Sequence, residues 1–224
     1  MKRLVLILCV LVVTGCGRPL TAPEADLASR MFGPGLDLTQ ARLSRNGLIG
    51  LQEHRFPARP QTTCRERISP PPDGPWLTGR TAGMTLGNQV NIRSDIYAED
   101  YARRPGGGMH LGAAMFLVHE LTHVWQWQNR ERTGYSLLRV GAEHRGRADP
   151  YLFDPETNAR FLDYGYEQQA SMVEEYVCCL ALDPEGARTQ RLHALLAQEM
   201  EPGALPEVDI WLPWAGVEPR GICG

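Results

Sequence analysis

The segment from His119 to His123 has the residue types and the spacing of a metal site with a catalytic base. It consists of His, Glu, Leu, Thr and His in that order. A helix advances about 100° per residue, so histidines four apart project from one face and can bind the same ion. Glu120 can reach a water on that ion without binding the ion itself, which is the arrangement of His-Glu-x-x-His hydrolases. The pattern predicts zinc bound by His119 and His123 with Glu120 as general base. The alternative is two helix histidines used for packing or surface charge.

A third protein ligand must come from elsewhere, because catalytic zinc usually takes three and leaves a fourth position for water. The metzincin pattern would need glycine at 126 and histidine at 129, where this chain has Gln126 and Asn129. We predict that the third ligand is Glu167, which opens a later helix and is followed by small residues. Its alternative role is an acid interacting with a helix dipole. Glu174 is the second candidate, as a ligand or as a hydrogen-bond partner of a ligand histidine.

With this ligand set, zinc would lower the pKa of its water toward about 7, and Glu120 would take the proton as water attacks a carbonyl. A further donor is expected to stabilise the oxyanion. Tyr164, Tyr166 and His144 lie in suitable segments, and the sequence does not choose among them.

The elements that must position these residues follow from chain breakers and uninterrupted runs. Residues 110–128 contain no proline and one glycine, which predicts a helix that carries the site. Alternating apolar residues at 81–93 predict a strand or hairpin before it. A second helical zone is expected from Asp154, interrupted at Gly165 and resumed at 166–182, with another helix reaching about Met200. We therefore expect an α+β fold, a mainly helical domain with a small β-sheet or hairpin beside the site helix.

The length of 224 residues suits one core and does not require two domains. We expect a signal peptide at 1–15, a tether at 16–30 and a single domain at 31–224. The prolines between 57 and 75 predict a loop there.

The N-terminus has the pattern of an exported lipoprotein. Lys2 and Arg3 precede an apolar run at 4–13, shorter than the roughly 20 residues that span a bilayer. The sequence Val-Thr-Gly-Cys, ending at Cys16, resembles the bacterial lipobox. This resemblance implies a lipid anchor at Cys16, and Gly17 after it implies the outer membrane, facing the periplasm. The alternative is an ordinary signal peptide with a chance cysteine.

The charge of the mature chain does not favour nucleic acid as a partner. Without residues 1–15, 21 basic side chains remain against 26 acidic ones, and no lysine follows Lys2.

Four cysteines remain beyond the anchor, an even number that predicts disulfides in an oxidising compartment. Neighbouring Cα atoms are about 3.8 Å apart, closer than a disulfide usually requires, so Cys178 and Cys179 are each expected to bond a distant partner. The pairing with Cys64 and Cys223 stays open. A four-cysteine zinc site is an alternative, which the lack of Cys-x-x-Cys pairs disfavours.

Residues 85–182 resemble gluzincin-type zincins, and more narrowly small bacterial proteins related to Vgr and Rhs secretion components. Those proteins carry similar His-Glu-Leu-Thr-His-Val-Trp-Gln and Glu-Gln-Gln-Ala segments. The resemblance implies a zinc metallopeptidase with a protein or peptide substrate and an association with a secretion system. Related sequences have an acid where this chain has Ser171, so Glu174 or Glu175 is expected to substitute for it. Two other functions stay open: an amidase acting on cell-wall peptide, and a metal-stabilised interaction module without turnover.

Overall fold

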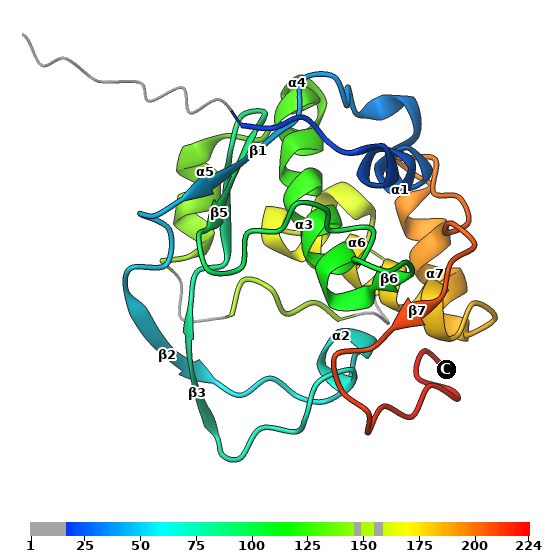
Figure 1. The fold of residues 1–224 in the computed structure, drawn as a ribbon. Helices are drawn as coiled ribbons and strands as arrows, with labels where there is room; N and C mark the ends of the chain where they lie inside the picture. The colour runs from blue at the N-terminus through cyan, green and yellow to red at the C-terminus, as the bar shows by residue number, and fades with distance from the viewer. Residues whose placement is uncertain (1–16, 146–148, 155–158) are drawn as a thin grey trace, which may run out of the picture.

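The computed structural model describes residues 17–145, 149–154 and 159–224. The predicted signal peptide at 1–15 and the predicted anchor Cys16 lie outside these residues, as does Pro155 at the expected start of the second helical zone. Within the described part, the α+β architecture predicted from the sequence is confirmed (Figure 1).

Two long helices form the centre of the fold. α3 (Leu111–Gln128) and α6 (Tyr166–Leu182) pack against each other, and both lie where the sequence predicted helices. α6 stops immediately before Asp183-Pro184, and α7 (Ala187–Leu196) follows. The helical zone expected from Asp154 is wrong for residues 159–165, because these described residues contain a short 3₁₀ turn, η2 (Phe161–Asp163), and no α-helix.

The N-terminal region is folded, which corrects the tether predicted for residues 16–30. α1 (Ala22–Phe32) begins with a capping box, in which Thr21 Oγ1 accepts from the Glu24 amide and the Glu24 carboxylate accepts from the Thr21 amide. Leu27 and Met31 on this helix are fully buried. The overall composition of the segment concealed both the Thr-x-x-Glu cap and an apolar face. η1 (Gly33–Gly35) continues the chain from α1.

A three-stranded sheet has the strand order β1-β5-β4. β1 (Arg42–Asn46) runs parallel to β5 (Gln89–Arg93), and β4 (Gly83–Leu86) pairs with β5 in antiparallel fashion. The β4–β5 hairpin confirms the prediction for residues 81–93. Its turn contains Gly87 at φ 64°, a backbone conformation that glycine adopts without strain.

The proline-rich stretch between residues 57 and 75 was predicted to be a loop. The structure confirms this in part, because a short helix interrupts the stretch and a strand lies at each end of it. β2 (Glu53–Pro57) pairs with β3 (Trp76–Arg80), and α2 (Cys64–Arg67) lies between them in sequence. Pro57 is tolerated because it lies at the end of a two-stranded ribbon with an open edge. The remaining short elements are α4 (Arg130–Thr133), α5 (Leu137–Glu143), β6 (Met109–His110) and β7 (Ile210–Trp211).

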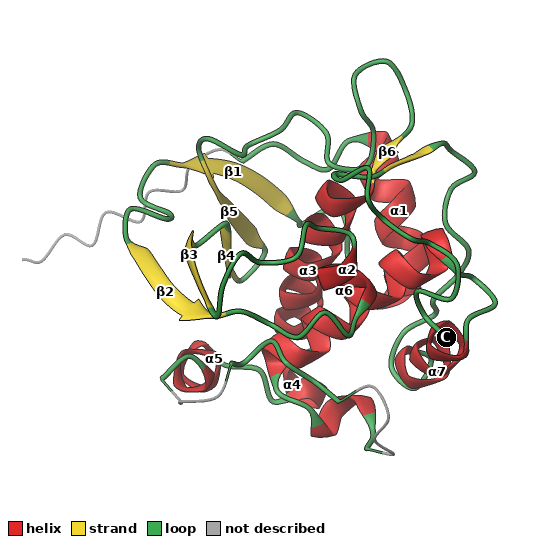
Figure 2. Ribbon diagram, turned by 90° about the horizontal axis from the view of Figure 1, so that it is seen from below, coloured by secondary structure: helices red, strands yellow, loops and turns green. Residues whose placement is uncertain are grey.

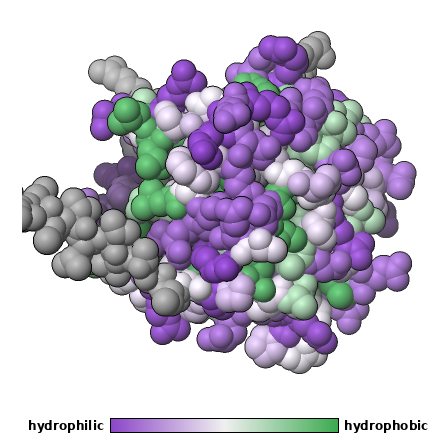
Figure 3. All heavy atoms as spheres, turned by 90° about the horizontal axis from the view of Figure 1, so that it is seen from above, coloured by the Kyte–Doolittle hydropathy of each residue, from purple (hydrophilic) through white to green (hydrophobic). Residues whose placement is uncertain are grey.

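α3 lies between the three-stranded sheet and α6, with α1 packed beside it (Figure 2). β4 is an edge strand and runs against α3, so an open strand edge lies beside the site helix. Hydrophilic residues cover most of the face shown in Figure 3, with apolar residues interspersed. No helix among the described residues is long and apolar enough to cross a membrane.

Two disulfides fasten α6 to distant segments. Cys64 bonds Cys178, which joins α2 to α6, and Cys179 bonds Cys223, which joins α6 to the C-terminal segment. The expectation that each adjacent cysteine bonds a distant partner is confirmed. The four-cysteine zinc alternative is wrong, since all four sulfurs are used in these bonds.

Candidate metal centre

The structure brings together the three residues predicted as metal ligands. His119 and His123 project from α3 toward α6, where Glu167 lies in the first turn. One ligand atom from each lies within 4.8 Å of the others, and all three residues are buried or nearly so. Oε2 of Glu167 is 3.3 Å from Nε2 of each histidine.

These distances fit a tetrahedral zinc ion. Zinc–ligand bonds of about 2.0–2.1 Å place neighbouring ligand atoms roughly 3.3–3.4 Å apart in a tetrahedron. Oε2 of Glu167 is buried and has no well-directed hydrogen-bond partner among the described residues. A buried carboxylate oxygen normally has such a partner. The donor set therefore fits a cation between these three side chains.

Both histidines are held through the ring nitrogen that faces away from Glu167. His119 Nδ1 lies 3.2 Å from Oε2 of Glu174, and His123 Nδ1 lies 2.9 Å from Oε1 of Gln126. Gln126 donates from Nε2 to the Tyr166 carbonyl, which fixes its Oε1 as the acceptor toward His123. The Nδ1 atom of His123 is then the protonated one, which leaves a lone pair on Nε2 for a metal.

Among the residues that sequence reasoning missed, Gln126 is the clearest. In the sequence Gln126 stands only as a departure from the metzincin pattern, yet its side chain is fully buried and orients His123. Glu174 occupies the role of hydrogen-bond partner to His119. Glu175 turns away from the site and accepts hydrogen bonds from the amides of Cys64 and Arg65.

The predicted general base, Glu120, faces β4. Thr85 donates from Oγ1 to Glu120 Oε2 at 2.7 Å, and both side chains are buried. Gly83 leaves the space that this carboxylate occupies, because a Cβ there would lie 2.5 Å from Glu120 Oε1. The predicted hairpin beside the site helix therefore positions the carboxylate of Glu120.

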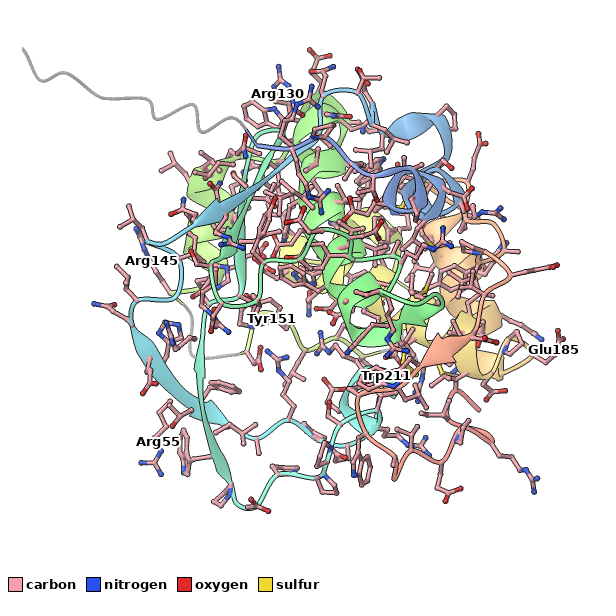
Figure 4. The ribbon with its side chains drawn as sticks, viewed as in Figure 1. Arg55, Arg130, Arg145, Tyr151, Glu185 and Trp211 are labelled. Carbon is pink, nitrogen blue, oxygen red and sulfur yellow. A yellow bond between two sulfur atoms is a disulfide. The ribbon has the colours of Figure 1, made fainter. Side chains whose placement is uncertain are left out.

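The more exposed side of the cluster is formed by His144 and Tyr151. His144 Nε2 lies 2.9 Å from Oε1 of Glu167, and its side chain is 41% exposed. The centroid of the Tyr151 ring, labelled in Figure 4, lies 5.8 Å from that of the His119 ring. The guanidinium of Arg59 lies over the same Tyr151 ring, 4.8 Å from its centroid. Tyr151 belongs to an irregular connection and carried no sequence signal.

Of the three candidates for an oxyanion donor, among which the sequence did not choose, His144 contacts the cluster through Glu167. The Tyr166 hydroxyl donates a hydrogen bond to the Gly134 carbonyl at 2.8 Å, so it holds this segment of the chain in place. Tyr164 packs against the hydrophobic core.

The surrounding carboxylates favour positive charge at this cluster. Burial by itself would lower the pKa of His119, but Glu167 and Glu174 raise it to about 10. Burial would raise the pKa of Glu167, but His123, His119 and His144 hold it far below its usual range. A divalent cation can supply this positive charge in place of the protons.

The fold and this cluster define an α+β protein whose central helix carries a candidate metal centre. No protein-family model matches the chain. The chain is 29% identical, over 164 residues, to the type VI secretion system spike protein VgrG2b of Pseudomonas aeruginosa. The solved effector domain of that VgrG2b shares the fold, with a TM-score of 0.54 and 22% identity over 83% of this chain and 84% of that domain.

The aligned region covers 71% of this chain and 13% of the full spike protein. The predicted resemblance to Vgr-related proteins is confirmed by these similarities. The chain thus matches a small part of a much longer protein and shares the fold of that protein's effector domain.

Proposed function

We propose that the chain is a zinc-dependent metallohydrolase, and specifically a peptidase. His119, His123 and Glu167 hold Zn²⁺, and Glu120 is the general base. The observation that carries the proposal is the buried Oε2 of Glu167, which lies 3.3 Å from both Nε2 atoms without a well-directed hydrogen bond. This arrangement is costly for a buried carboxylate unless a cation completes it.

When bound, zinc supplies a Lewis acid that acidifies water and polarises a carbonyl group. Glu120 takes the proton from the attacking water and returns it to the leaving amine. Thr85 keeps one carboxylate oxygen of Glu120 oriented while the other takes the proton. His144 donates to Oε1 of Glu167, which leaves Oε2 facing the two histidines.

An extended peptide suits the surface beside the site. β4 has an open edge in the described sheet, and its Met84 and Leu86 are each 44% exposed. Edge strands bind peptides through main-chain hydrogen bonds, with alternating side chains entering pockets. The similarity to a secretion-system spike protein supports an association of this chain with a secretion system as well.

We also propose that the protein acts in the bacterial envelope, anchored by lipid at Cys16 to the outer membrane and facing the periplasm. Two disulfides in the folded part support an oxidising compartment. A peptidase there would act on protein or on peptide links of the cell wall.

The test is elemental analysis of the purified full chain, together with hydrolysis of casein and of peptidoglycan. We expect one zinc per chain in the wild type and in Glu120→Gln, and a marked loss in Glu167→Ala. We expect Glu120→Gln to lose about 10²–10⁴-fold in hydrolysis, because it keeps the shape of the side chain without the base. A folded wild type that takes up no zinc would sink the proposal. Full hydrolysis by Glu120→Gln would exclude this residue as the base.

A further inference from the structure

Arg65 lies outside the ligand set but is joined to it through Glu174. Its Nη1 lies 3.2 Å from the same Oε2 of Glu174 that contacts His119 Nδ1, and it also donates to the Ser171 hydroxyl at 3.0 Å. Its Nε and Nη2 bind Glu66. The side chains of Arg65 and Glu174 are only 12% and 17% exposed, so this ion pair is shielded from solvent.

The short helix that carries Arg65 is held on α6 by three separate ties. Cys64 bonds Cys178, and the amides of Cys64 and Arg65 donate to the two oxygens of Glu175 at 2.8 and 3.0 Å. Glu175 and Cys178 are three residues apart on α6, so they lie on one side of the helix. A four-residue helix is not stable by itself in water. α2 therefore depends on these contacts for its position.

We propose that Arg65 is a positioning residue for the metal ligand His119, and that the Cys64–Cys178 disulfide holds it in place. The proposal rests on the zinc site proposed above. Arg65 fixes the carboxylate of Glu174, and Glu174 fixes the imidazole of His119 through Nδ1. Without Arg65, Glu174 is a shielded carboxylate with one partner fewer, and the His119 ring loses its fixed orientation. Formation of the Cys64–Cys178 disulfide should therefore increase the affinity of the chain for zinc.

The experiment measures the zinc dissociation constant of the full chain by competition with a coloured chelator. Arg65→Ala should weaken zinc binding by about 10–100-fold, the usual cost of losing support behind a metal ligand. The matched control is Arg67→Ala on the same helix, because Arg67 donates to the Ile222 carbonyl and has no contact with Glu174 in the bonds described. It should bind zinc like the wild type.

Two further comparisons separate positioning from general damage. In a Glu174→Gln background, the Arg65→Ala change should have little additional effect, because no carboxylate charge remains to be fixed. Replacing Cys64 and Cys178 by alanine should weaken zinc binding, while replacing Cys179 and Cys223 should lower stability only. Arg65→Lys keeps a cation near Glu174, so its zinc dissociation constant should lie between those of the wild type and of Arg65→Ala. This variant tests the proposal even if Arg65→Ala does not fold.

The outcomes distinguish this inference from the proposed function. If the wild type binds zinc and Arg65→Ala binds it as tightly as Arg67→Ala does, the positioning role is wrong and the zinc site stands. If Arg65→Ala is equally harmful in the Glu174→Gln background, Arg65 does not act through Glu174. A wild type that binds no zinc overturns both proposals.

Discussion

Glu120 shows how closely a single side chain of the site depends on its neighbours. One of its oxygens accepts a hydrogen bond from the Thr85 hydroxyl. The other would lie 2.5 Å from a Cβ at position 83, which is closer than such atoms can approach. A side chain at position 83 would also lie 2.9 Å from the Phe116 ring. The contact with Glu120 is the closer of the two, and a Cβ cannot approach an oxygen to 2.5 Å, so the carboxylate must shift to admit a side chain at position 83.

We therefore predict that Gly83→Ala displaces the Glu120 carboxylate. Peptide hydrolysis should fall by up to about 10²-fold, the order of magnitude for misplacing a catalytic group by 1 Å. Zinc content should be unchanged, because Glu120 is not among the ligands. Gly74→Ala is the control, since a Cβ there meets nothing within 4 Å. Equal hydrolysis rates for the two variants would contradict the role given to Gly83.

At the scale of the element, α3 starts with an unusual cap. His110 accepts the Ala113 amide on Nδ1 at 3.2 Å, and its ring contacts Trp211 of β7. Only the neutral ring can accept this hydrogen bond. Burial lowers the pKa of His110 below its ordinary value of 6.5. The cap of the helix that carries the site is thus sensitive to acid.

This gives a prediction with a definite sign. The unfolded chain binds the His110 proton more readily than the folded protein, so the stabilisation is complete above about pH 6.5 and is lost as pH falls below it. Asparagine caps helices without titrating. As the pH is lowered, the free energy of unfolding of His110→Asn should therefore fall less than that of the wild type, and the difference should be roughly 1 kcal/mol, the usual contribution of a helix cap.

Chemical denaturation at a series of pH values between neutral and mildly acidic measures this difference. His54→Asn is the control, because His54 lies on the exposed β2 strand, and it should follow the wild-type curve. Parallel curves for His110→Asn and wild type would rule out the proposed acid sensitivity of the cap.

At the scale of the whole molecule, the folded part begins almost immediately after the predicted anchor. Arg18 pairs with the buried carboxylate of Glu24 at 2.6 Å, and its backbone forms an antiparallel bridge with Leu43 of β1. Glu24 also accepts from the Tyr101 amide. With residues 18–24 held against the core, a lipid on Cys16 would keep the domain close to the membrane surface.

We predict that Cys16→Ser releases the protein from the membrane fraction, because the acyl chains would have no attachment site. Immunoblots of membrane and soluble fractions measure this, with Cys9→Ser as the control, since Cys9 lies within the apolar run. If Cys16→Ser stayed in the membrane fraction, the proposed lipid anchor at Cys16 would be wrong.

Features that depend on neighbours along the chain follow from the order of the residues alone. The spacing of His119 and His123 places them on one helix face, and the Gly87-Asn88 turn fixes the hairpin beside it. Glu167 could be predicted as their partner because catalytic zinc usually takes a third protein ligand, and Glu167 opens a later helix with small residues after it. The capping box of α1 was also readable, yet it was overlooked in a segment interpreted as a tether.

The surroundings of these residues depend on how distant segments pack together. Tyr151 reaches the site from an irregular segment, and Thr85 and Arg65 reach it from segments distant in sequence. Gln126 lies on the site helix itself, but its role depends on its rotamer and burial. The pairing of Cys64 with Cys178 likewise follows from the packing of α2 on α6. Local spacing constrains a helix face because the backbone is regular there, whereas contacts between distant segments depend on how the whole chain packs.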